Sequence, residues 1–176
     1  MTTALITGCS SGIGLATAVE FARQGCDVVA TMRDLDRSQP LSDALAAAGV
    51  SAEVCALDVN DGASVHELAA RLGEVDVVVS NAGIGIDGST EELTIDDFRR
   101  SFETNVLGSV RLLHAVLPTW RGRGSGRFIA VSRSRSPVRA ERTGPTTAGT
   151  VEWNNATKRV TPSTFSYTAS VHQKQP

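Results

Sequence analysis

The sequence predicts an α/β fold in which helices cover both faces of a doubly wound parallel sheet. Short apolar runs alternate with segments of helical periodicity along the first 132 residues, and this alternation is typical of a parallel sheet with helical crossovers. The apolar runs are continuous, which indicates strands that are buried on both faces. Because the composition changes after residue 132, we expect the sheet to be truncated after about five strands.

The composition divides the chain into two parts. Residues 1–132 contain 10 arginines and 17 acidic residues, a net charge of −7, whereas residues 133–176 have a net charge of +5. The second part has no Leu, Ile or Met, but has eight Thr, five Ser and four of the six Pro. Such a segment buries too little apolar surface to offset the entropy that is lost on ordering. We therefore expect a folded body over residues 1–132 and a basic, disordered tail over residues 133–176.

The first strand and the first helix follow one another directly. Residues 4–6 are an apolar run that ends before Gly8, as a buried parallel strand would. Apolar residues then recur with helical spacing over residues 13–23, and Gly25 is a typical stop signal. The next apolar run, residues 26–32, predicts a second strand.

The same alternation continues to a fourth strand. Pro40 is suited to the first turn of a short helix, and Asp61 or Ser64 can cap a longer one. The run Val75–Val79 is apolar apart from Asp76, which predicts a buried strand. The two helices of this part are predicted at residues 40–48 and 61–72, and the two strands at residues 51–57 and 75–79.

A long helix and a fifth strand complete the body. Thr94 followed by Asp97 resembles a capping box with Asp in place of Glu. Pro118 is expected to end this helix, and residues 127–132 predict the fifth strand. The helix is predicted to be amphipathic, with one apolar stripe through Phe98, Phe102, Val106, Val110, Leu113 and Leu117.

The loop between the first strand and the first helix is rich in glycine. Its spacing is G-x-x-x-G-x-G with no following Lys, which disfavours a nucleoside triphosphatase loop. Gly8 allows a tight turn, Gly12 lets a pyrophosphate approach the backbone, and Gly14 lets the helix pack closely on the strand. The loop thus predicts dinucleotide binding at a helix N-terminus, with a plain tight turn as the alternative. The predicted cofactor contacts in this loop are Gly8, Ser10, Ser11, Gly12, Ile13 and Gly14.

The end of the second strand indicates which dinucleotide is bound. Arg33 lies 19 residues after Gly14, at the position where an acidic residue would bind the ribose hydroxyls of NAD(H). A guanidinium there can hold a 2′-phosphate through two hydrogen bonds, and the Ser10 hydroxyl can add another. We therefore expect NADP(H), with NAD(H) kept possible by the neighbouring Asp34. The alternative is a solvated Arg33–Asp34 pair at a strand end.

Three motifs together carry a family resemblance. They are the glycine-rich loop Thr7–Gly14, the triplet Asn81–Gly83 after the fourth strand, and the pair Thr104-Asn105 in the long helix. With the stretches TGCSSGIGLA, VVATMRDL, GEVDVVVSNAGIG and TNVLGSVRLLHAVLP, the sequence resembles the short-chain dehydrogenases/reductases. It is nearest to the branch that contains retinol dehydrogenase and estradiol 17β-dehydrogenase. The resemblance covers about residues 1–132.

The resemblance implies a Rossmann-like sheet, a nicotinamide cofactor, and hydride exchange between an alcohol and a ketone or aldehyde. By that resemblance, Asp58 and Val59 contact the adenine, and Asn105 holds the water of a proton relay. The alternatives are a helix-cap carboxylate for Asp58 and a satisfied polar residue at a helix kink for Asn105. The contacts implied for the adenosine ribose and the centre of the sheet are Asn81, Ala82 and Gly83.

The sequence departs from the family where the catalytic residues are expected. The family has two adjacent serines after the fifth strand, and Arg133 stands at the second, catalytic one. Ser132 or Ser134 is therefore the candidate catalytic serine.

The family's Tyr-x-x-x-Lys motif is also missing. In that motif the lysine lowers the pKa of the phenol, so that the tyrosine exchanges a proton with the substrate oxygen. One alignment puts Thr146 and Thr150 at the two positions, and another puts Asn154 and Lys158 there. The sole tyrosine, Tyr167, has no Lys four residues later. Asn154 and Lys158 are thus the weak catalytic candidates.

Three functions stay open. By lineage the chain is an NADP(H)-linked oxidoreductase. The alternatives are a non-catalytic, truncated or frame-shifted nucleotide-binding protein, and an interaction protein whose basic tail is the working part. The change in composition at Arg133 is what a change of reading frame would produce, and a tail with its own role is the alternative.

The end of the predicted sheet bears on solubility and assembly. Without a sixth strand the fifth strand would be an uncovered edge, which favours aggregation. A family-type homo-oligomer is not expected.

Charge and hydropathy narrow the partners and the compartment. A net charge of −2 gives no general attraction to nucleic acid, and apolar runs of at most five residues are too short to span a membrane. The start of the chain lacks the basic residues of a signal peptide, and the three cysteines show no metal-ligand spacing. We therefore expect a cytoplasmic protein without a metal, a nucleic-acid partner or a membrane span, and the family resemblance implies a small alcohol or carbonyl compound as its partner.

Overall fold

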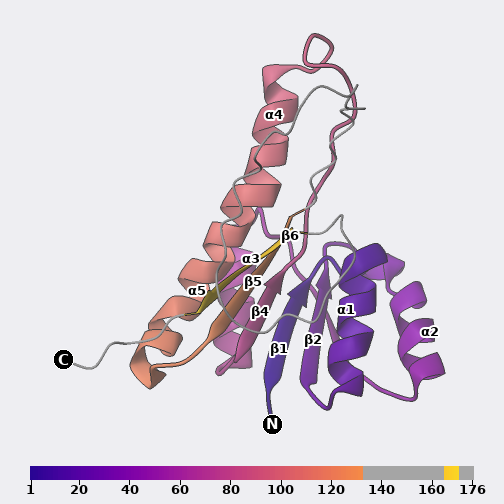
Figure 1. Cartoon of the computed structure of the whole chain (residues 1–176), viewed down its shortest axis with the longest axis vertical. Coiled ribbons are helices and arrows are strands. Elements are labelled where there is room, and N and C mark those ends of the chain that lie inside the picture. The colour runs from indigo at the N-terminus through magenta and orange to yellow at the C-terminus, as the bar shows by residue number, and fades with distance from the viewer. Residues whose placement is uncertain (133–164, 171–176) are drawn as a thin grey trace, which may run out of the picture.

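The computed structural model describes residues 1–132 and 165–170 of the chain. Its six strands are β1 (Thr3–Thr7), β2 (Asp27–Met32), β3 (Glu53–Ala56), β4 (Val77–Ser80), β5 (Arg127–Ser132) and β6 (Phe165–Ser170). They form one sheet in the order β3-β2-β1-β4-β5-β6 (Figure 1). β1 to β5 are parallel to their neighbours among themselves, which confirms the predicted doubly wound, Rossmann-like sheet.

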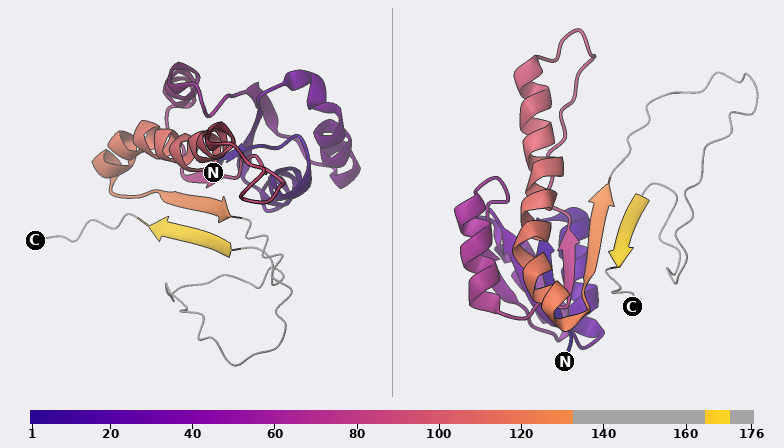
Figure 2. Two further views of the ribbon diagram at one scale, coloured as in Figure 1. Left: turned by 90° about the horizontal axis from the view of Figure 1, so that it is seen from above. Right: turned by 90° about the vertical axis from the view of Figure 1, so that its left-hand side faces the viewer.

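Helices cover both faces of this sheet (Figure 2). Their bounds are α1 (Gly12–Arg23), the 3₁₀ turn η1 (Leu35–Arg37), α2 (Gln39–Ala48), α3 (Gly62–Leu72), α4 (Ile95–Phe102), the π-helical turn η2 (Glu103–Leu107) and α5 (Gly108–Arg123). α1 and α2 pack on one face, and α3 and α5 pack on the other. α4 extends beyond the carboxyl ends of the strands (Figure 1).

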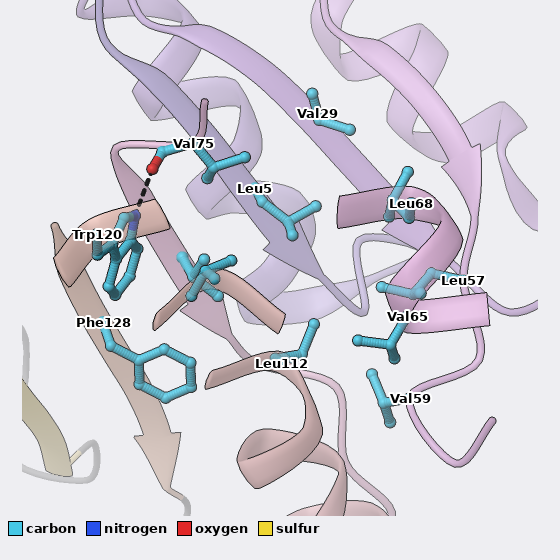
Figure 3. Packing of buried hydrophobic residues seen from close by; sticks show 12 residues of the cluster. Leu5, Val29, Leu57, Val59, Val65, Leu68, Val75, Leu112, Trp120 and Phe128 are labelled. Atoms are coloured by element: carbon cyan, nitrogen blue, oxygen red, sulfur yellow. Dashed lines mark hydrogen bonds between the residues drawn. The ribbon is translucent and has the colours of Figure 1, made fainter. Parts of the chain in front are cut away.

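Successive side chains of the central strands enter two different cores. Leu5 of β1 and Val78 of β4 pack with α3 and α5, whereas their neighbours Ile6 and Val79 pack with α1 and α2. This alternation, with a period of two, is why strands covered on both faces are continuous apolar runs. The core between the sheet, α3 and α5 is drawn in Figure 3, and it contains Leu5, Val29, Leu57, Val59, Val65, Leu68, Val75, Val78, Leu112, Val116, Trp120 and Phe128.

The end of α5 is tied to the segment that precedes β4. The Trp120 indole N–H donates to the Val75 carbonyl (Figure 3). The Arg123 guanidinium donates to the same carbonyl at 2.6 Å and pairs with Asp76 at 3.0 Å. The prediction that the helix ends at Pro118 is therefore wrong, because these contacts hold the last turn in place as far as Arg123.

The long helix predicted from the sequence corresponds to α4, η2 and α5. The prediction that its apolar stripe packs on the sheet is wrong. The predicted capping box is confirmed at Thr94 and Asp97, but Phe98 and Phe102 are 43% and 55% exposed. The buried side of α5 carries Gly108, Leu112, Val116 and Trp120. At Gly108 a Cβ atom would lie 2.8 Å from Cγ2 of Val59, so the absence of a side chain permits the close approach.

β6 is a strand that the sequence analysis does not predict. It runs antiparallel to β5, with Ser132 opposite Phe165 and Arg127 opposite Ser170. The expectation that β5 is an uncovered edge is therefore wrong, since β6 pairs with β5 along its whole length. Phe, Tyr and Thr favour strands, and the average composition of the whole tail concealed this short run. The rest of the expected tail, residues 133–164 and 171–176, lies outside the described residues.

Candidate functional site

The predicted cofactor residues gather at the carboxyl ends of the parallel strands. The strand order reverses between β1 and β4, and ligands of doubly wound sheets bind in the crevice at such a point. The segments that leave β1, β2, β3 and β4 there are residues 8–11, 33–34, 57–60 and 81–84.

Thr7 and Asn81 join two of these segments. The Thr7 hydroxyl oxygen accepts the backbone N–H groups of Asn81 at 3.0 Å and of Ala82 at 2.9 Å. The Asn81 amide group donates to the carbonyls of Thr7 at 2.9 Å and of Gly8 at 3.2 Å. The glycine-rich loop and the Asn81–Gly83 segment are thus one cross-linked unit, and the Asn81 side chain is engaged within the protein.

Two glycines of the loop lie where no side chain fits. Gly8 has a φ of +72°, and a Cβ atom on it would lie 2.9 Å from Cα of Ala82. A Cβ atom on Gly14 would lie 2.2 Å from the Gly8 carbonyl oxygen. Gly12 has a φ of +60° with open space around it. The turn at Gly8 and the close packing at Gly14 agree with the spacing, and Gly12 has the open space that a close approach of pyrophosphate would need.

The N-terminus of α1 is open to an anion. Ser11 is the N-cap residue, and its side chain makes no capping hydrogen bond. Ser11, Gly12 and Ile13 are exposed, and Ser10 is half-buried. The first backbone N–H groups of a helix have no partner within the helix and carry partial positive charge, so this end suits a pyrophosphate.

Arg33 is available to a ligand. Among the described residues no ion pair or hydrogen bond engages its guanidinium, whereas the Asp34 side chain accepts the N–H of Asp36 at 3.0 Å and caps η1. Arg33 and Asp34 are both exposed at the end of β2 and form no ion pair with one another. The guanidinium borders an open cavity of about 510 Å³, which is lined by Arg33, Asn60, Ile84, Arg99, Arg100, Glu103 and Thr104.

The segment after β3 forms a turn and not a helix cap. Oδ1 of Asp58 accepts the N–H of Asn60 at 2.9 Å, whereas α3 is capped by Asp61, which accepts the N–H of Ala63 at 2.9 Å. Val59 is buried. The Asn60 amide donates to the Thr104 hydroxyl at 3.1 Å, so this turn is tied to η2.

Asn105 lies in η2 and holds the segment after β4. Its Oδ1 accepts the N–H of Ile84 at 2.8 Å, and its Nδ2 donates to the Ile84 carbonyl at 2.9 Å and to Oγ of Ser101 at 3.1 Å. A Cβ atom on Gly83 would lie 3.0 Å from Oδ1 of Asn105. The side chain is thus satisfied by protein groups, and π-helical turns often mark functional positions.

Of the catalytic candidates that follow α5, the structure describes only Ser132. Ser132 is the exposed last residue of β5, while Ser134, Asn154 and Lys158 lie outside the described residues. The sole tyrosine, Tyr167, is in β6, in register with Ala130 of β5. Within residues 1–132 and 165–170 there is no tyrosine four residues before a lysine on a helix.

Several residues at the site are not predicted from the sequence. Arg99, Arg100 and Thr104 line the cavity beside Arg33, and Asn60 links it to η2. The spacing of four residues between Arg100 and Thr104 places them on one side of a helix, and this signal is available in the sequence. Nothing local indicates that Thr104 would meet Asn60, 44 residues earlier.

Cys9 gives a test of how firmly the loop is packed. The thiol is fully buried and donates to the Ile6 carbonyl at 3.2 Å, and burial raises its pKa from 9.0 to about 12. The folded chain therefore holds this proton more tightly than the unfolded chain. Its contribution to stability is complete below pH 9 and is lost as the pH rises toward 12, at up to about 1.4 kcal/mol per pH unit.

Urea unfolding at pH 8 to 10.5 measures this contribution. We expect the free energy of unfolding to fall more steeply with pH for the natural chain than for Cys9→Ala, which has no thiol to titrate. Parallel pH dependences for the two proteins would show that Cys9 is not packed as described.

The amino-acid sequence is similar to those of known dehydrogenases over about three quarters of this chain. The chain is 46% identical over 136 residues to retinol dehydrogenase 8 of Bos taurus, covering 74% of this chain and 44% of that protein. It is 46% identical over 136 residues to human 17-beta-hydroxysteroid dehydrogenase type 1, covering 73% and 42% of the two chains. This chain therefore spans less than half the length of these curated relatives.

Solved structures share the fold. An alcohol dehydrogenase from Thermococcus sibiricus, complexed with 5-hydroxy-NADP, matches with a TM-score of 0.63 and 37% identity, over 71% of this chain and 55% of that one. Actinorhodin polyketide ketoreductase with NADPH matches with a TM-score of 0.67 and 34% identity, over 72% and 51%. Within the part of the chain that the structure describes, no helix is both long enough and apolar enough to cross a membrane. Since the short chain dehydrogenase family model matches residues 2–144, this chain belongs to the short-chain dehydrogenase family.

Proposed function

We propose that this chain binds NADP(H) at the carboxyl edge of its sheet, and that its family reaction is hydride exchange between an alcohol and a ketone or aldehyde. The observation that carries the proposal is the glycine-rich loop, cross-linked through Thr7 and Asn81, at the same edge of the sheet as Arg33, whose guanidinium is unpaired among the described residues. A Cβ atom on Gly8 or Gly14 would collide with Ala82, Asn81 or Gly8 of this unit, whereas the space around Gly12 is open.

Each part of the dinucleotide has residues that suit it. The pyrophosphate suits the open N-terminus of α1 at Ser11, and the 2′-phosphate suits the guanidinium of Arg33 and the hydroxyl of Ser10. The adenine suits the turn at Asp58 and Val59, and the ribose suits the backbone of Asn81–Gly83. When bound, the nicotinamide ring gives or takes the hydride.

The relatives support the cofactor and the type of reaction. Two of the matched structures contain 5-hydroxy-NADP and NADPH, and a third, a metagenomic short-chain oxidoreductase, is in complex with NADP. Two curated relatives are named for retinol and for 17-beta-hydroxysteroids. We infer from this an alcohol or carbonyl compound as the substrate class, with residues 1–132 as the binding body.

A second candidate function is non-catalytic nucleotide binding. The observation that favours it is the lack of a Tyr-x-x-x-Lys motif, because the sole tyrosine, Tyr167, is followed four residues later by Val171. The two functions share the cofactor site and differ only in turnover, so an activity assay on a chain that binds NADPH separates them.

Replacing Arg33 with alanine is expected to weaken NADPH binding by about tenfold or more while leaving NADH binding nearly unchanged, because only NADPH carries the 2′-phosphate. Fluorescence titration of the full chain with each cofactor measures both affinities. Arg37→Ala, an exposed arginine of η1 that does not line the cavity, is the matched control. Equal affinities of the natural chain for NADPH and NADH would refute the assignment of Arg33.

A further inference from the structure

The cavity beside Arg33 is bordered by two further arginines from a distant part of the sequence. Arg33 follows β2, whereas Arg99 and Arg100 belong to α4, and all three line the same cavity of about 510 Å³. A cavity lined by arginines from two separate segments suits a doubly charged phosphate, since a guanidinium group can form paired, charge-assisted hydrogen bonds.

The structure holds Arg100 on the cavity side of its helix. The hydroxyl oxygen of Thr104, one helical turn later, accepts a hydrogen bond from the Asn60 amide at 3.1 Å. Residues four apart share a side of a helix, so the contact between Thr104 and Asn60 aligns Arg100 with the turn after β3. Glu103 also lines the cavity, but its carboxylate is paired with Arg111, which offsets its negative charge.

Arg99 and Arg100 each form an ion pair with an aspartate of α4, but these pairs are weak enough for an anion to compete with them. Arg99 pairs with Asp96 at 2.8 Å and Arg100 with Asp97 at 3.5 Å, each three residues apart on α4, and both arginine side chains are at least 70% exposed. Such exposed pairs are weak, because water and salt screen them. Neither aspartate lines the cavity, so a phosphate there competes with weak pairs only.

We propose that Arg100, with Arg99 beside it, forms the second side of the site for the 2′-phosphate of NADP(H), opposite Arg33. This inference rests on the proposed function, and it adds specificity-determining residues from α4 to the arginine that follows β2. The adenosine 2′-phosphate then lies between α4 and the segment after β2, and the hydrogen bond of Asn60 to Thr104 ties the turn after β3 to η2, which continues α4.

The test compares two small ligands that differ only in the phosphate. 2′,5′-ADP carries the 2′-phosphate and 5′-AMP does not, and calorimetric titration of the full chain gives the affinity for each. We expect Arg100→Ala to weaken 2′,5′-ADP binding by about five- to tenfold and to change 5′-AMP binding by less than about twofold. Arg100→Lys should lose less, since it keeps the charge but not the planar donor pair. Arg121→Ala, which removes an exposed arginine at the far end of α5, is the matched control.

The outcomes separate this inference from the proposed function. A natural chain that binds neither ligand, or binds both equally, overturns the proposed function together with the inference. A natural chain that prefers 2′,5′-ADP, and that loses this preference in Arg33→Ala but keeps it in Arg100→Ala and in the double variant Arg99→Ala, Arg100→Ala, overturns the inference alone. An equal loss for both ligands in Arg100→Ala also overturns it, because the arginine would then contact the adenosine and not the phosphate.

Discussion

Replacing Gly14 with alanine is expected to lower the affinity for NADPH by about ten- to a hundredfold. The added Cβ atom would lie 2.2 Å from the Gly8 carbonyl oxygen and 2.4 Å from Nδ2 of Asn81. Neither neighbour is free to move, because Asn81 is bonded to the Thr7 and Gly8 carbonyls and its N–H to the Thr7 hydroxyl. Relief of the clash would therefore displace the loop from α1. Overpacking of this kind costs about 1 to 3 kcal/mol or more, and each 1.4 kcal/mol is about tenfold in affinity.

The measurement is a fluorescence titration with NADPH, together with urea unfolding to follow stability. Gly62→Ala is the matched control, because Gly62 is in the first turn of α3 with no heavy atom within 4 Å of an added Cβ. Gly12→Ala should be intermediate, since its φ of +60° is unfavourable for alanine but its surroundings are open. An affinity for NADPH within threefold of the natural chain in Gly14→Ala would contradict the close packing of loop and helix.

The chain is expected to bind NADPH but to show no measurable ketone-dependent oxidation of it. Loss of a general acid such as the family's tyrosine typically lowers a rate by about 10²- to 10⁴-fold. Asn105 cannot supply the proton, because its side chain is an amide already bonded to Ile84 and Ser101. The hydroxyl of Ser132 has no lysine four residues on to lower its pKa. Tyr167 lies in β6, outside a helical Tyr-x-x-x-Lys arrangement.

The assay follows NADPH absorbance with a panel of ketones, aldehydes and retinoid-like carbonyl compounds, on a preparation whose NADPH binding has first been measured. Asn154→Tyr recreates the motif with Lys158 and serves as the rescue variant. We expect no activity from it either, because the sequence around residue 154 has few apolar residues with which a helix could dock. Repeated turnover by the natural chain would exclude non-catalytic nucleotide binding and establish the oxidoreductase function.

Much of the fold depends on signals that act over a few residues. The fifth strand is predicted at residues 127–132 and β5 spans Arg127–Ser132, because a continuous apolar run suffices for a buried strand. The start of α4 at Thr94 and Asp97 follows from side-chain to backbone hydrogen bonds within one turn. The strand predicted at residues 51–57 shortens to Glu53–Ala56, because only these residues pair with β2. β6 depends wholly on the edge of β5 to which it bonds.

The sequence by itself determined the positions of the glycine-rich loop and of Arg33, because glycine spacing and the order of strands place them at the carboxyl edge of a parallel sheet. Only the tertiary structure decided which groups fasten and complete that edge. The Thr7 hydroxyl reaches the N–H of Asn81, 74 residues later, and Asn60 reaches Thr104, 44 residues later. The tertiary structure also decided that Phe98 and Phe102 stay exposed while Trp120 is buried. The physical reason is that backbone conformation and periodicity are local, whereas a hydrogen-bond partner or a packing surface is known only once distant segments have met.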